Sequence, residues 1–498
     1  MDTLHASPQP AAALVGGFPA PLPHADRRRW MAFVVLCAGT FMMVIDTTIV
    51  NVALPSVQAD LGFTAEGLAW VVNAFMLTFG GFLLLGGRLG DLYGPRRLFL
   101  LGIVLFTLAS LGCGLSTTAT LLIAMRALQG LGAAIVSAVG LSLVVNLFPE
   151  PLERTKAMAY FGFIAAGGGA IGVLLGGLLT DAFDWHWVFL VNVPIGVAVV
   201  VAGLRILPKG GAHAQGQRLD VAGAVLVTAA SVTAVYAVVN ANTVGWGSLQ
   251  TLGLLGAAAA LLGGFLLLES RLRQPLMPLA LFRHRNLATA NVVGVLWAAA
   301  MFAWFFLSAL YMQFVLGYSP LQVGLGFLPS NLIMAAFSLK LSEKAVNRFG
   351  LRIPMSVGLA LAGLGLLLFA RAPVDGTFAV DVLPGMLLLG LGAGLAFNPV
   401  LLSAMNDVKP EDSGLASGLV NTSFMMGGAL GLAVLASLAA WRAADLGASG
   451  VGDVAALNGG YHAAFLAGAV AAFAAAALGA AVLRPSQVPA GAGTPMAH

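Results

Sequence analysis

Apolar stretches long enough to cross a membrane recur along this chain and restrict its fold more than any other feature. A helix that spans a hydrocarbon core about 30 Å thick needs about 20 mostly apolar residues, because each residue rises about 1.5 Å. Fourteen such stretches run approximately over residues 31–52, 68–87, 98–116, 121–147, 158–180, 187–207, 220–240, 250–268, 287–312, 321–339, 353–370, 382–405, 414–440 and 462–484. Strands of a membrane barrel would be about ten residues long and would alternate in polarity, which these segments do not. The sequence therefore predicts an all-α integral membrane protein with 14 transmembrane helices.

Composition excludes a soluble protein. Hydrophobic residues make up 59% of the 498 residues and charged residues only 9%, whereas soluble proteins carry about 25% charged residues. A water-soluble domain needs polar surface to cover its core, and this chain has too little of it. Lipid must therefore be its solvent.

The distribution of basic residues predicts the orientation in the membrane. With the amino terminus inside, 21 of the 24 Lys and Arg residues fall in inner loops; only Arg371 and Arg442 fall outside, and Arg126 lies within a span. Cytoplasmic loops carry this excess of Lys and Arg in membrane proteins. We expect both termini to be cytoplasmic, in a bacterial-type cytoplasmic (inner) membrane, and we attribute the net charge of +4 to topology and not to a nucleic-acid partner.

The ends of the chain differ in composition from the spans. The first residues are rich in Pro and Ala and have no basic leading segment, which favours a disordered cytoplasmic tail over 1–30 and not a signal peptide. A second disordered tail is expected over 485–498. Cys37 and Cys113 both fall inside predicted spans, so we expect them to pack and not to form a disulfide.

A glycine- and arginine-rich segment joins the second and third predicted helices. Its sequence, GRLGDLYGPRR over residues 87–97, resembles the signature loop of the major facilitator superfamily. A weaker echo appears 256 positions later, where Phe349, Gly350 and Arg352 align with Tyr93, Gly94 and Arg96 and Asn347 stands in the position of Asp91. The chain thus resembles two related halves, as secondary transporters often do, with the substrate site at their interface near the midplane.

Two further helices and four local motifs resemble the fourteen-helix drug:proton antiporter branch of that superfamily. The motifs end the first helix, open the sixth, precede the ninth and lie within the thirteenth, over residues 46–55, 185–196, 275–282 and 421–431. The resemblance implies the major-facilitator fold of two six-helix bundles plus two inserted helices. The implied parts are an amino-terminal bundle over 31–207, an inserted pair over 208–270, and a carboxy-terminal bundle with a leading cytoplasmic linker over 271–484.

Two charged residues, Asp46 and Arg126, lie well inside the predicted spans, away from their ends. Asp46 is the only carboxylate well inside one, and an ionised Asp at a helix centre costs about 2.5–3.5 kcal/mol on insertion scales, so it should face protein or a water cavity. We expect Asp46 to be the proton and cation site. Arg126, with Gln129 on the same helix face, lies in a segment similar to the superfamily's helix-four motif, whose Arg is linked to proton transfer. The alternatives are structural: Asp46 bonded to the hydroxyls of Thr47 or Thr48, and Arg126 bonded to backbone carbonyls of the first helix.

The signature loop supplies the candidate conformational latch. Its residues are Gly87, Arg88, Asp91, Gly94, Arg96 and Arg97. The glycines permit tight turns, and Asp91 is expected near the start of the third helix, where the helix dipole favours an anion, with the arginines around it. The resemblance implies a cytoplasmic latch that holds one alternating-access state. The alternative is control of topology by the arginines alone.

The fifth helix is dense in small residues. Gly172, Gly176 and Gly177 resemble the antiporter motif of the family, although Val173 stands where that motif usually has Pro. The alternative is simple close packing of helices.

Candidate substrate residues lie on three helices. Met42 and Met43 share the helix face of Asp46, Gln129 lies on the fourth helix, and Phe424 and Met425 lie in the thirteenth. Methionine suits a pocket that accepts different shapes. The alternative is that these side chains face lipid or pack in the core.

These features favour a secondary active transporter. We expect multidrug efflux: export of amphipathic drug-like or toxic molecules in exchange for protons by alternating access, which would confer antibiotic resistance. The sequence has no phosphate-cradling loop and no metal-ligand spacing, so we expect no enzyme activity, cofactor, nucleotide or nucleic acid, and the partners would be lipid, protons and substrate. The alternatives are an exporter of one metabolite or self-made antibiotic, a proton-coupled uptake symporter, and a membrane-embedded enzyme or receptor.

Overall fold

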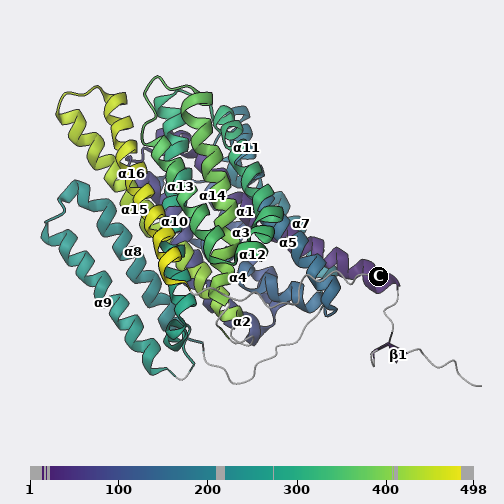
Figure 1. Ribbon diagram of the computed structural model, residues 1–498. Helices are drawn as coiled ribbons and strands as arrows, with labels where there is room; N and C mark the ends of the chain where they lie inside the picture. The colour runs from purple at the N-terminus through teal and green to yellow at the C-terminus, as the bar shows by residue number, and fades with distance from the viewer. Residues whose placement is uncertain are drawn as a thin grey trace, which may run out of the picture.

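The computed structural model describes residues 14–15, 18–19, 23–208, 219–272, 274–405, 408 and 413–483, and almost all of them are helical (Figure 1). Two short strands, β1 (Leu14–Val15) and β2 (Phe18–Pro19), pair antiparallel ahead of the first helix. That helix begins at Pro23, inside the predicted tail. The predicted tail over 485–498 lies outside the described residues.

The first part of the chain forms the amino-terminal bundle. Its helices are α1 (Pro23–Leu61), α2 (Trp70–Tyr93), α3 (Pro95–Gly114), α4 (Ala119–Leu147), α5 (Pro151–Ala182), α6 (Trp187–Leu190) and α7 (Asn192–Ile206), with a 3₁₀ turn, η1 (Gly67–Ala69), before α2. The short α6 leads into α7, and together they occupy the sixth predicted span. In this bundle α4 packs against α2 and α3, and α1 packs against α5 and α7.

Two helices then form a separate pair at one flank of the molecule, α8 (Val221–Val244) and α9 (Leu249–Arg271) (Figure 1). They pack against each other, and α8 also packs against α2 and α15. The pair occupies the seventh and eighth predicted spans.

The last part of the chain forms the second bundle. Its elements are η2 (Leu279–Arg283), α10 (Arg285–Leu310), η3 (Tyr311–Val315), α11 (Pro320–Ala336), η4 (Phe337–Leu341), α12 (Ser342–Phe349), α13 (Arg352–Phe369), η5 (Phe378–Val382), α14 (Leu383–Met405), α15 (Ser413–Ala448) and α16 (Asp453–Val482). The turns η3, η4 and η5 are π-helical and continue or precede neighbouring helices. Within this bundle α10 packs against α15, and α13 packs against α14 and α16.

Twelve helices of the described chain are long and apolar enough to cross a membrane, and two shorter apolar helices, Gly167–Ala182 and Pro320–Ala336, accompany them. This set agrees with the predicted all-α membrane fold and is consistent with fourteen spans. Some helices extend beyond the predicted limits, because a helix continues past the hydrocarbon while hydropathy detects only its apolar part. The last predicted stretch begins at residue 462, whereas α16 begins more than two turns earlier, at Asp453, for this reason.

The two bundles meet along two helix pairs, α2 with α15 and α5 with α11. Small residues allow the second contact. A Cβ atom on Gly177 would lie 3.0 Å from the Cα of Leu321, and one on Gly324 would lie 3.0 Å from the Val173 carbonyl oxygen. In the first contact, Gly80 of α2 faces Met425 of α15 in the same way. Glycine therefore sets how closely the halves approach.

Candidate functional site

A buried ion pair joins α1 to α4. Asp46 and Arg126 are both fully buried, and Arg126 Nη1 donates to Asp46 Oδ2 over 2.6 Å. The sequence singled out these two residues separately, as the acid and the base within predicted spans, and the structure brings them together. Each charge thus has its counter-charge in a region where an unpaired ion would be costly.

Two amides complete the surroundings of the Asp46 carboxylate. Its other oxygen, Oδ1, accepts hydrogen bonds from Gln129 Nε2 at 2.7 Å and from Asn192 Nδ2 at 3.0 Å. Gln129 lies one turn after Arg126 on α4, and Asn192 is the first residue of α7. The carboxylate therefore has three donors from two helices besides its own, which is the arrangement that a buried anion requires.

The Arg126 guanidinium has further acceptors. Its Nη1 also donates to Gln129 Oε1 at 2.6 Å, and its Nε donates to the Val71 carbonyl oxygen at 2.8 Å. The rings of Phe75 and Phe189 lie 4.6 and 5.7 Å from its central carbon, close enough for cation–π attraction. Because guanidinium stays protonated in proteins, Asp46 is the member of the pair that can gain and lose a proton.

The structural alternatives for this pair do not match the observed contacts. Thr47 Oγ1 donates to the Val44 carbonyl and Thr48 Oγ1 to the Ile45 carbonyl, so neither hydroxyl bonds to Asp46. The backbone carbonyl that Arg126 contacts belongs to α2, not to the first helix. Hydroxyls on a helix bond back to its own carbonyls in this way, which leaves the carboxylate to partners on other helices.

Asn192 bonds directly to the Asp46 carboxylate but was not predicted as a site residue. Its only sequence signal is a polar amide near the start of an apolar span, within the motif over 185–196. An amide in such a run is expensive to bury without partners, and its contact with Asp46 explains its presence. Gln129 was assigned to the substrate cavity as well as to the Arg126 face, and the structure places it in the charged cluster.

The glycines of α5 lie beside this cluster. A Cβ on Gly172 would lie 2.8 Å from the Ile45 carbonyl oxygen, and Gly176 is equally close to Ile49, so α5 packs directly on the turn of α1 that carries Asp46. Gly177 faces α11 of the other bundle. The helix runs without interruption through Val173, because valine, unlike proline, keeps its backbone donor.

The candidate latch differs from the prediction in one respect. Asp91 lies in the last turn of α2 and not at the start of α3, because α2 continues through Gly87 and Gly90 and ends at Tyr93. The chain turns at Gly94, whose φ of +90° favours glycine. The prediction ended the second helix at residue 87, where the apolar stretch ends, whereas the helix itself continues through two glycines to Tyr93. The side chain of Asp91 lies outside the described residues.

The arginines of this segment have separate environments. Arg96 Nη2 donates to the Leu204 carbonyl oxygen at 2.8 Å, in the last turn of α7, where free carbonyls and the helix dipole favour a cation. Arg88 is half-buried, and Arg97 is exposed. The segment thus fastens the start of α3 to the end of α7.

The predicted substrate residues are not gathered around one described cavity. Met42 and Met43 are buried, Phe424 contacts the rings of Phe302 and Phe397, and Met425 packs near Gly80. A cavity of about 380 Å³ lies between the bundles, with Pro55 and Gln58 on one side and Phe306 and Tyr461 on the other. It includes none of the predicted residues.

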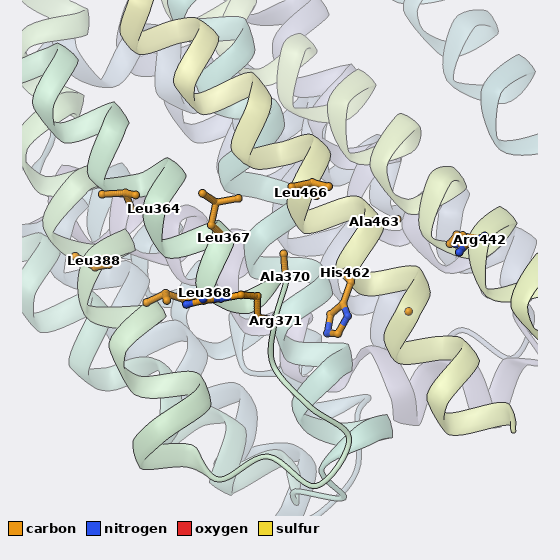
Figure 2. A pocket seen from close by; sticks show the side chains of 11 residues that line it. Leu364, Leu367, Leu368, Ala370, Arg371, Leu388, Arg442, His462, Ala463 and Leu466 are labelled. Atoms are coloured by element: carbon orange, nitrogen blue, oxygen red, sulfur yellow. The ribbon is translucent and has the colours of Figure 1, made fainter. Parts of the chain in front are cut away.

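A second cavity, of about 730 Å³, lies among α13, α14, α15 and α16 (Figure 2). Leucines of α13 form much of its wall, and Arg371 and His462 lie near the loop that follows α13. The His462 ring is hydrogen bonded to the Ala372 carbonyl oxygen at 2.7 Å, as expected for a satisfied histidine. This cavity is remote in the chain from the Asp46 cluster and contains none of its residues.

A two-bundle helical membrane fold with an ion pair buried in one bundle defines a multi-pass transporter. Residues 36–432 match the Major Facilitator Superfamily, and the chain belongs to this family. The resemblance seen in the signature loop is therefore confirmed.

Similar proteins include antibiotic exporters of bacteria. The cephamycin export protein CmcT of Amycolatopsis lactamdurans is 40% identical over 81% of this chain and 84% of its own length. The puromycin resistance protein pur8 of Streptomyces alboniger is 38% identical over 82% of each chain. Among solved structures, the nucleoside transporter NupG superposes with a TM-score of 0.64 at 12% identity, covering 91% of this chain and 99% of its own, which shows the fold alone.

Proposed function

We propose that this chain exports amphipathic drug-like or toxic molecules in exchange for protons by alternating access. Its similarity to a puromycin resistance protein, a cephamycin export protein and the multidrug resistance protein Stp of Mycobacterium tuberculosis, each over more than 80% of this chain, supports export as the direction. The bias of 21 inner basic residues among 24 supports a cytoplasmic membrane location with both termini in the cytoplasm.

The observation that carries proton coupling is the Asp46–Arg126 pair. In the ionised state the carboxylate is balanced by Arg126 and receives amide hydrogen bonds from Gln129 and Asn192. Protonation removes the negative charge, so Arg126 loses its counter-charge while it remains buried. The contacts that join α1 to α4 and α7 then favour a different arrangement, and the two charge states bias the two access states.

The glycine face of α5 provides a mechanical connection for this change. It packs against α1 beside Asp46 through Gly172 and against α11 of the other bundle through Gly177. A second contact between the bundles is the hydrogen bond from Gln313 Nε2 to the Val52 carbonyl oxygen at 3.0 Å. Movement of α1 relative to α5 would therefore change the contact between the two halves.

The proton gradient supplies enough free energy to concentrate a substrate. One proton moving down 100 mV and one pH unit releases about 2.3 plus 1.4 kcal/mol. This energy sustains roughly a 500-fold gradient of a neutral substrate. For a monovalent cation exchanged one for one the voltage contributions cancel, and about tenfold per pH unit remains.

A dedicated exporter of one antibiotic is the second candidate, and the similarity to a cephamycin export protein favours it. Proton flux in proteoliposomes tests both, with candidate substrates such as puromycin and a cephamycin added in turn. The proposal expects protons to move only when substrate is present, in the direction opposite to the movement of the substrate. Several unrelated substrates would indicate multidrug export, one would indicate a dedicated exporter, and co-directional flux would overturn antiport in favour of a symporter.

A further inference from the structure

A second buried acid lies far from Asp46, at the end of the α8–α9 pair. Glu269, in the last turn of α9, is only 3% exposed. Asp220 is the N-cap residue of α8 and accepts a hydrogen bond from the Gly223 amide at 2.8 Å through Oδ1. The two helices are antiparallel neighbours, so the end of one lies beside the beginning of the other.

Each carboxyl group uses one oxygen for the backbone and turns the other toward the same place. Glu269 Oε2 accepts from the Met277 amide at 2.9 Å. Glu269 Oε1 and Asp220 Oδ2 are both buried without a hydrogen-bond donor among the described residues. Both lie against Gly223, where a Cβ would be 2.7 Å from Glu269 Oε1 and closer still to Asp220 Oδ2. Two carboxyl oxygens without a hydrogen-bond donor among the described residues therefore lie close together beside Gly223.

Two ionised carboxylates cannot hydrogen bond to each other, because both are acceptors only. One proton between Glu269 Oε1 and Asp220 Oδ2 resolves this conflict: it removes one of two adjacent negative charges and supplies the missing donor. Leu85, Ala224 and Leu276 form a buried apolar cluster at this end of the helix pair, and Glu269 is itself buried, so two charges there would also be poorly solvated.

No cation in the described chain is hydrogen bonded to this pair. The charged groups on the packed elements are Arg88 of α2, which is half-buried, and Arg271 of α9, which is exposed. The side chain of Asp91 and residues Arg218 and Arg273 lie outside the described residues. A shared proton is thus the charge balance that the described contacts support.

We propose that Asp220 and Glu269 form a second proton-binding site, which holds one shared proton and fastens the α8–α9 pair to the segment after α9. The site lies beyond the proposed antiport reaction and is separate from Asp46. When the proton is bound, Asp220 and Glu269 attract each other while Glu269 holds the Met277 amide. When it leaves, the negative charges of buried Glu269 and half-buried Asp220 repel each other and this end of the pair loosens.

Linkage gives the sign of the pH effect. In the unfolded chain both acids are ionised above about pH 4–5, whereas the folded pair retains a proton. The folded state then binds more protons, so its stability falls as pH rises through the range in which the pair loses that proton.

Infrared difference spectroscopy of the full-length protein in lipid nanodiscs tests the proposal. We expect a protonated-carboxyl band at neutral pH that is lost in both Glu269→Gln and Asp220→Asn and is retained in Asp46→Asn. Both substitutions preserve shape, because an amide can donate to the remaining carboxylate and still accept from the backbone. Absence of the band from the wild-type protein, or its survival in both variants, would overturn the proposal.

Thermal unfolding between neutral and alkaline pH gives an independent readout. Wild-type Tm should fall as pH rises, and Glu269→Gln should lose that slope because its amide is a permanent donor. Asp381→Asn, which changes an acid whose carboxylate accepts only from the Thr377 amide, is the matched control and should keep the wild-type slope. An equal slope in wild type and Glu269→Gln contradicts the shared proton, and so does a Tm that depends on sodium concentration at fixed ionic strength, since it would indicate a bound cation.

Discussion

Asp46 Oδ2 lies 2.6 Å from Arg126 Nη1, although the two residues are 80 positions apart and belong to different helices. Both side chains are fully buried, so neither charge can be removed without leaving the other unbalanced. We expect three properties of the chain to depend on this pair, and each can be tested separately. They are the coupling of transport to protons, the stability of the amino-terminal bundle, and the contact of α1 with α5.

Asp46→Asn should abolish uphill export. Asparagine keeps the shape and can still accept from Gln129 and Asn192, but it cannot carry a proton. Downhill exchange of a neutral substrate should continue, since alternating access does not itself require titration. Proteoliposomes with an imposed pH gradient measure both behaviours on the same purified protein. Asp181→Asn, which changes an exposed acid of α5, is the control. If Asp46→Asn accumulates substrate as well as the wild type does, another group must carry the proton.

Arg126→Gln should destabilise the protein by about 3–5 kcal/mol, because it leaves the Asp46 charge buried without its partner. Adding Asp46→Asn to this variant should restore part of the loss, because the second change removes the unbalanced charge. Denaturant unfolding in detergent measures the free energy of unfolding of the wild type, the two single variants and the double variant, which together form a double-mutant cycle.

The control for Arg126→Gln is Arg442→Gln. Arg442 forms an exposed ion pair with Asp445, a kind of pair that contributes about 0–1 kcal/mol. Equal destabilisation by the two single variants would contradict the strong coupling expected of the buried pair.

Gly177→Ala should slow transport by disfavouring the state in which α5 contacts α11. The new methyl group would meet the Pro320 carbonyl and the Cα of Leu321, and such overpacking costs about 1–3 kcal/mol. Gly167→Ala on the same helix is the matched control, because a Cβ there has no neighbour within 4 Å. Initial export rates at equal expression compare them, and equal rates would remove the α5–α11 contact from the mechanism.

Asp91→Asn should impair transport while leaving membrane insertion intact, because the signature loop would keep its arginines and lose their counter-charge. Transport rate and surface expression are the two measurements. Asp375→Asn, at an exposed acid in the loop before α14, is the control. If Asp91→Asn transports normally at normal expression, the segment does not act as a latch, and its arginines serve only to control topology.

Single cysteines at Ser7, Ser319 and Thr494 test the orientation. A membrane-impermeant thiol reagent added to whole cells should label the cysteine at Ser319 and neither of the others, since 21 of 24 basic residues place both termini inside. The native Cys37 and Cys113 are buried and unpaired, so background labelling should be low. Labelling at Ser7 or Thr494 from outside would reverse the proposed topology.

The sequence by itself determined the helices of this protein. A run of about 20 apolar residues has few alternatives in lipid, because every backbone polar group must be bonded within its own helix. The predicted stretches therefore coincide with helices throughout the described chain. Helix ends were less accurate: α1 begins at Pro23 and α15 continues to Ala448, since polar residues beyond the hydrocarbon give no hydropathy signal.

The sequence also determined which charges matter within the spans. Asp46 and Arg126 stand out because an ion in an apolar run is costly, whatever surrounds it. Glu269 was missed for the opposite reason. It lies just beyond the predicted span over 250–268, where an acid normally reaches water, and only the structure shows that it is buried and accepts from the Met277 amide.

Only the tertiary structure decided the partners of these groups. Asp46 meets Arg126 and Asn192 from helices far along the chain, and α5 meets both α1 and α11 through glycines. Hydropathy records the cost of burying a charge, which is a local property of the sequence. The compensation for that cost comes from side chains on other helices, and their positions depend on how all the helices pack.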